Sequence, residues 1–89
     1  MSAGMMTKTK EVMITISLAQ LRNGAVARVV GFTGGRGFKR RLATRGIKIG
    51  AEVRIVTRQP AGPLVIEVAR RKMTLGRGMA RKIQVEVSL

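Results

Sequence analysis

Short stretches in which apolar and polar residues alternate, divided by glycine and proline, run through most of this chain. The clearest are residues 14–18, where Ile14, Ile16 and Leu18 alternate with polar neighbours, and residues 83–87 near the other end. Alternation places successive side chains on opposite faces of an extended segment, as in a half-buried strand. The chain is therefore predicted to be mainly β, with further strands over residues 25–31, 52–58, 64–68 and 73–75.

One helix interrupts this series of strands. Residues 31–37 hold four glycines, which indicates a loop with unusual backbone angles. A helix is expected over residues 38–45, where Phe38 and Leu42 lie one turn apart on a face suited to burial. A short helical turn is expected at residues 76–80. This order predicts a small, partly open β-barrel of five to six short strands, with one inserted helix and a helical turn before the last strand.

The length of 89 residues fits a single domain with one modest core. Residues 1–12 are polar, methionine-rich and without periodicity, so we expect a flexible leader there and one domain over residues 13–89. The longest charge-free stretch near the N-terminus, residues 12–21, is about half as long as a membrane-spanning helix. We therefore expect a soluble, cytoplasmic protein.

The residue types that are missing limit the chemistry. The sequence contains no His, Cys, Asp, Tyr or Trp, which excludes Ser-His-Asp and Cys-His catalytic groups and metal sites built on thiolate or imidazole. The four carboxylates are scattered, and three of them, Glu52, Glu67 and Glu86, stand in expected strands. We predict that the protein is not an enzyme and that it holds no cofactor and no metal.

Basic residues outnumber acidic ones by 18 to 4, which gives a net charge of +14. Such a charge points to an acidic partner, either nucleic acid, an anionic lipid surface or an acidic protein. The alternative is a solvated basic surface with no specific partner. The basic residues form a helix cluster of Arg36, Lys39, Arg40, Arg41, Arg45 and Lys48, and a second cluster of Arg70, Arg71, Lys72, Arg77, Arg81 and Lys82. All of these residues except Arg77, Arg81 and Lys82 are predicted to bind a partner.

The glycine-rich loop before the helix raises the question of phosphate binding, because helix N-termini attract anions. Its spacing does not match a P-loop. It does not match the dinucleotide-binding fingerprint either, since Arg40 stands where the third glycine is required. A tight strand-to-helix turn is the preferred interpretation.

Several motifs follow one another in a defined order over residues 13–89. They are Leu18-x-x-Leu21-x-x-Gly24, Val29-x-Gly31, Gly34-Gly35, Arg41-Leu42-x-x-x-Gly46-Ile47-x-x-Gly50-x-x-Val53, Pro60-x-Gly62-Pro63-Leu64-x-Ile66-x-Val68, and Leu75-Gly76-Arg77 with Ala80-x-x-Ile83-x-Val85. Each motif is weak alone, but their joint order resembles that of the ferrous iron transport protein A (FeoA) family. Ile49 is a departure, because members of that family often carry proline at this position.

The resemblance implies an SH3-like β-barrel with a helical insertion. It also implies a small cytoplasmic accessory protein that binds or regulates a membrane ferrous iron transporter of the FeoB type. The charge is high for this family, which favours docking at the inner membrane against anionic lipid or acidic transporter loops.

Several alternatives stay open. A basic nucleic-acid-binding barrel is one, although only Phe32 and Phe38 could stack on bases. Self-association through an exposed barrel edge is another. The scattered glutamates in a positive field lead us to expect no high-affinity ferrous iron site in the isolated protein.

Overall fold

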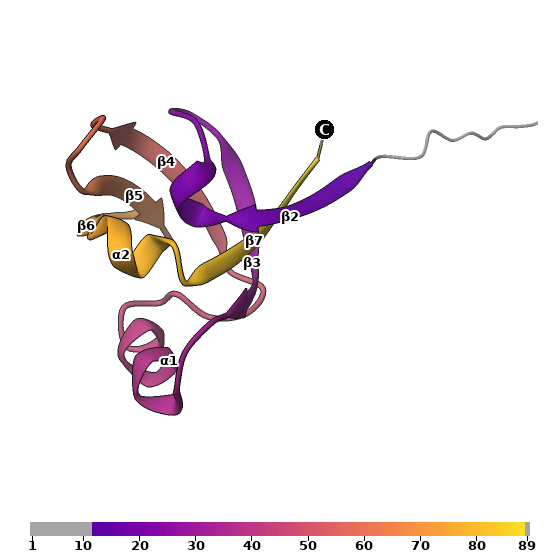
Figure 1. Ribbon diagram of the computed structural model, residues 1–89, viewed down its shortest axis with the longest axis vertical. Helices are drawn as coiled ribbons and strands as arrows, with labels where there is room; N and C mark the ends of the chain where they lie inside the picture. The colour runs from indigo at the N-terminus through magenta and orange to yellow at the C-terminus, as the bar shows by residue number, and fades with distance from the viewer. Residues whose placement is uncertain (1–11, 89) are drawn as a thin grey trace, which may run out of the picture.

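The computed structural model describes residues 12–88 of the chain. Within them, six strands, two α-helices and one 3-10 turn follow one another in the expected order (Figure 1). The elements are β2 (Met13–Ser17), η1 (Leu18–Gln20), β3 (Val26–Phe32), α1 (Arg36–Ala43), β4 (Glu52–Arg58), β5 (Leu64–Val68), β6 (Arg71–Leu75), α2 (Arg77–Ala80) and β7 (Ile83–Ser88). The leader expected over residues 1–12 lies outside the described residues except for Val12, which is exposed.

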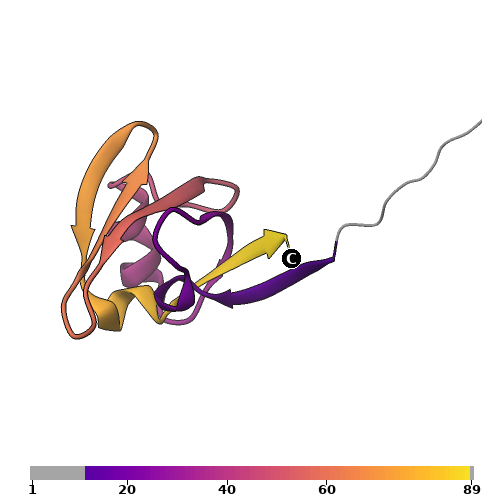
Figure 2. The same cartoon turned by 90° about the horizontal axis from the view of Figure 1, so that it is seen from above.

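The six strands form one antiparallel sheet in the order β2-β7-β3-β4-β5-β6. β3 lies between β7 and β4, so it is a central strand of the sheet. The two outer strands, β2 and β6, do not pair with each other, so the barrel is only partly closed. α2 packs against η1, and β2 and β7 extend beyond the rest of the sheet as a two-stranded ribbon (Figure 2). The mainly β, partly open barrel predicted from the sequence is confirmed.

A single aliphatic core lies inside the curved sheet. Its largest fully buried side chains come from β3, β4, β5, β6 and β7, from η1, and from α1 and the turn after it. Leu42 and Ile47, both fully buried, attach the helix to this core. Because Leu42 is the one buried residue of α1, most of the helix surface is left for other contacts.

The helix α1 begins and ends two residues earlier than the predicted 38–45. The prediction failed because it treated all four glycines of residues 31–37 as loop. Gly35 has an extended backbone and is the N-cap, whereas Gly37 is helical. Of the four, only Gly34 has a positive φ, at 142°. The unusual backbone angle is therefore confined to one position in the loop.

The chain reverses between β5 and β6 in a tight turn. Ala69 and Arg70 both have positive φ, at 52° and 67°, as in the two-residue hairpins that match the twist of a sheet. β6 begins at Arg71, two residues earlier than the strand predicted over 73–75. Arg70 thus stands in the turn, whereas Arg71 and Lys72 belong to a strand.

Candidate partner-binding surface

The three glutamates of the described residues lie on the outer face of the sheet. Arg28 on β3 stands directly opposite Glu86 on β7 and Glu52 on β4, and Arg54 on β4 stands opposite Glu67 on β5. Residues directly opposite in antiparallel strands share a face, so each glutamate has an arginine beside it. The Arg54 Nε atom donates a hydrogen bond to Glu67 Oε1 at 3.0 Å. Negative charge within residues 12–88 is therefore confined to one face, where Glu67 forms an ion pair with Arg54.

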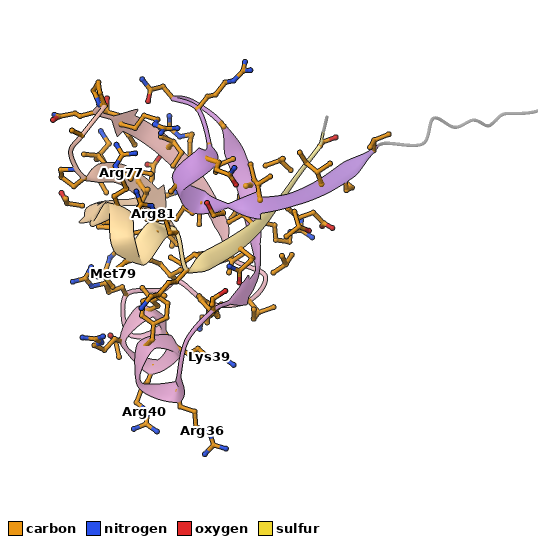
Figure 3. All side chains as sticks on the ribbon, viewed as in Figure 1. Arg36, Lys39, Arg40, Arg77, Met79 and Arg81 are labelled. Carbon is orange, nitrogen blue, oxygen red and sulfur yellow. The ribbon has the colours of Figure 1, made fainter. Side chains whose placement is uncertain are left out.

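The nine residues predicted to bind a partner lie elsewhere, and all are exposed. Figure 3 shows Arg36, Lys39 and Arg40 pointing away from the rest of the protein at the outer end of α1. We call the nine residues together the basic surface: Arg36, Lys39, Arg40, Arg41, Arg45, Lys48, Arg70, Arg71 and Lys72.

Tertiary structure joins the two basic clusters. Thr44 and Arg45, just after α1, line one groove together with Arg71, Lys72 and Met73 of β6. Cations from two segments that are far apart in the sequence therefore face the same space. A groove lined by several fixed cations concentrates positive potential and attracts an anionic group.

A second groove continues this connection. Lys48, from the turn before β4, lines it together with Arg70, from the turn after β5. Arg54 and two glutamates, Glu52 and Glu67, line it from the sheet. The basic surface thus borders the one ion pair that the described residues contain, between Arg54 and Glu67. Its far edge runs along α1, whose residues carry no acidic side chain.

Arg77, a member of the second sequence cluster, serves the fold instead. Its Nη2 atom donates hydrogen bonds to the carbonyl oxygens of Gln59, Pro60 and Gly62, the last two at 3.1 and 3.3 Å. These carbonyls belong to the turn between β4 and β5. Arg77 therefore fastens α2 to that turn, a role that no local sequence signal indicates.

The two phenylalanines are also used within the fold. Phe32 and Phe38 meet edge to face with ring centroids 6.4 Å apart. Lys82 places its Nζ atom 5.5 Å from the centroid of the Phe38 ring, at cation–π distance. Both rings are half-buried, so neither is an open platform on which a nucleic acid base could stack.

Within residues 12–88, no three His, Cys, Asp or Glu side chains gather in a group that could hold a metal ion. The same residues include no helix that is long and apolar enough to span a membrane. The arrangement therefore offers cation-lined grooves as its main chemical feature.

These features define a small, partly open β-barrel domain with a strongly basic surface. Residues 16–87 match the model of the FeoA domain, so the chain belongs to the FeoA domain family, and it is a ferrous iron transport accessory protein. The resemblance noted in the sequence is thereby confirmed.

Individual relatives agree with this assignment. The chain is 35% identical over 69 residues to the "Putative Fe(2+) transport protein A" of Methanocaldococcus jannaschii, covering 78% of this chain and 83% of that protein. It is similar to the crystal structure of an iron uptake regulatory protein, FeoA, with 25% identity and a TM-score of 0.78 over 83% of this chain and all of that one.

A third relative supports the fold class. The structure of Stenotrophomonas maltophilia FeoA with zinc, described as a prokaryotic SH3 domain protein, has a TM-score of 0.69 and 25% identity over 81% of this chain and 95% of that one. The expected SH3-like fold is confirmed.

Proposed function

We propose that this protein docks onto the cytoplasmic side of a membrane ferrous iron transporter of the FeoB type, and that the basic surface forms the contact. The protein works as a binding partner of the transporter and performs no chemical step itself. Its own location is then the cytoplasm, at the inner face of the membrane.

The observation that carries this proposal is the groove between α1 and β6. Arg45 from one cluster and Arg71 and Lys72 from the other line it, and all three are exposed. A solvated helix face needs no such convergence, because cations repel one another and gain by lying apart. Their placement together raises the electrostatic free energy of the folded protein. An acidic partner lowers it again through charge-assisted hydrogen bonds to arginine.

The separation of charge supports the same interpretation. No glutamate lines the groove of Arg45, Arg71 and Lys72, whereas Glu52 and Glu67 line the groove of Lys48 and Arg70 and partly neutralise that end of the basic surface. Acidic loops of a transporter are therefore attracted to one side of the molecule. Membrane lipids with anionic headgroups extend the same attraction, at about 1 kcal/mol for each nearby Lys or Arg.

The test is co-purification with the cognate transporter from detergent-solubilised membranes. We expect the triple variant Arg40→Glu, Arg41→Glu and Arg45→Glu to lose the transporter. The double variant Arg45→Glu and Arg71→Glu, with one change on each side of the groove, should lose most of it as well.

A matched double variant controls for net charge. Arg22→Glu and Arg81→Glu make the same change in charge as the double groove variant, at two exposed positions outside the basic surface, and this variant should keep the transporter. If the folded triple and groove variants retain the transporter as well as the control does, the basic surface is not the contact. Binding of the wild-type protein to nucleic acid and to the transporter should also be compared at physiological salt. If only the transporter stays bound, the function is docking and not nucleic acid binding.

A further inference from the structure

The outer edge of β2 lacks the features that normally keep edge strands from pairing. Edge strands are usually protected by charged side chains, proline or a bulge. β6, the other edge, carries Arg71 and Lys72. β2 has the sequence Met-Ile-Thr-Ile-Ser, without charge or proline, and its register with β7 is unbroken. No strand within residues 12–88 pairs with its outer edge, which is therefore open to another strand.

The three central residues of β2 are symmetric about Thr15, although the end residues Met13 and Ser17 differ. Ile14 and Ile16 flank Thr15 on either side. If two copies of β2 pair antiparallel about a two-fold axis at Thr15, then Thr15 meets Thr15 and Ile14 meets Ile16 of the other copy. Such pairing extends the rows already present in the sheet, because Ile14 stands opposite Val87 and Ile16 opposite Val85 on β7. Apolar and β-branched cross-strand pairs of this kind stabilise a sheet.

The shape of the molecule leaves this edge accessible. In both views β2 and β7 extend away from the body of the barrel, and α1 lies on the other side (Figures 1 and 2). Residues 12–21 carry no charge, so the two paired segments do not repel each other electrostatically. Val12 and Met13, which begin this segment, are 57% and 44% exposed and would become more covered.

We propose that two copies of this protein pair through β2, antiparallel and centred on Thr15, to form one continuous sheet. The contact is a single strand pair, smaller than the interface of a stable dimer, so the association is weak and depends on concentration. It leaves the basic surface of each copy free, and a dimer therefore presents two such surfaces at once.

The test uses Thr15, which is exposed in one copy, so that charge there perturbs the dimer more than the fold. Thr15→Glu places two carboxylates opposite each other at the axis, flanked by Glu86 of each copy. We expect the dissociation constant to rise about fivefold or more, measured by sedimentation over a range of concentrations. Thr15→Lys disturbs less, since Glu86 lies beside it, and mixing the Glu and Lys variants should restore pairing.

The matched control is Thr74→Glu, at an exposed threonine on the other edge strand, β6. It should leave the association unchanged. A second readout uses the lack of cysteine in the chain: Thr15→Cys should form a disulfide-linked dimer on mild oxidation, and Thr74→Cys should not.

Two results would overturn the proposal. One is a wild-type protein that stays monomeric up to about 1 mM, a concentration that populates even weak complexes. The other is association that Thr15→Glu does not weaken and that Thr15→Cys does not capture. A segment of the transporter could pair with this edge while the protein alone stays monomeric. That outcome would also overturn the proposal.

Discussion

Arg77 stabilises the fold, unlike the arginines of the basic surface. Replacing it by alanine measures its contribution to the free energy of unfolding. Its Nη2 atom reaches three carbonyl oxygens of the turn between β4 and β5. One nitrogen has two hydrogens, so at most two of these bonds are made at full strength together. Arg77→Ala therefore removes about two charge-assisted hydrogen bonds.

The expected loss follows from the place of these bonds near the surface. A hydrogen bond to a charged group contributes about 1.5–3 kcal/mol when it is well buried. Arg77 is only half-buried, and water can solvate the released carbonyls, so the contribution has to be reduced. We expect a loss of about 1–2 kcal/mol in the free energy of unfolding. In a domain of this size that corresponds to a fall in Tm of about 5–15 °C.

The assay is urea unfolding followed by circular dichroism, with Arg81→Ala as the matched control. Arg81 is the neighbouring exposed arginine at the end of α2, and its alanine variant should change stability by less than about 0.5 kcal/mol. Arg77→Lys should fall between the two, because a lysine ammonium cannot reproduce the spread of donors of a guanidinium. Equal stability of the two alanine variants would refute the structural role of Arg77. At a temperature where it is folded, Arg77→Ala should still bind the transporter.

Three further outcomes are expected. Gly46→Ala should destabilise the protein by about 1 kcal/mol, because Gly46 has a φ of +87°. Gly78→Ala should stabilise it by about 0.5–1 kcal/mol, because Gly78 lies inside α2 with open space around it. If urea unfolding shows a change of the same sign for both variants, the backbone argument is wrong. Co-sedimentation should show more binding to anionic than to neutral vesicles, with the difference lost at high salt, and equal binding to both would count against membrane docking. Equilibrium dialysis without oxygen should find no stoichiometric, micromolar ferrous iron binding, and a one-to-one complex would disprove this expectation.

Local patterns were sufficient for most of the strands, because alternation depends only on neighbouring residues. The segments 52–58 and 64–68 were predicted with the bounds they have in the structure. The start of α1 could not be found in this way. Gly35 and Gly37 look alike in the sequence, yet one is an extended cap and the other is helical, and the choice depends on where Leu42 packs in the core.

For a similar reason, only part of the candidate site could be predicted from the sequence. Composition and spacing identified which residues are basic, and the nine residues of the basic surface are all exposed as expected. The sequence placed Arg77 and Lys82 in one cluster with Arg70, Arg71 and Lys72, and although they were not among the nine predicted residues, it gave no sign of the contacts that hold them. Those two side chains are held by the turn before β5 and by the Phe38 ring, contacts that exist only after distant segments have come together.

The sequence by itself determined the mainly β class, the family and the kind of chemistry available, because these follow from local pattern and from which residue types are present. Tertiary structure alone decided where charge gathers and where it is matched. Pairing of β3 with β4 and β7 set Arg28 beside two glutamates, and the folding of the segment after α1 placed Arg45 on the same groove as Arg71. Electrostatic interactions depend on distance in space, which the order of residues does not specify, so the basic surface appears only in the folded chain.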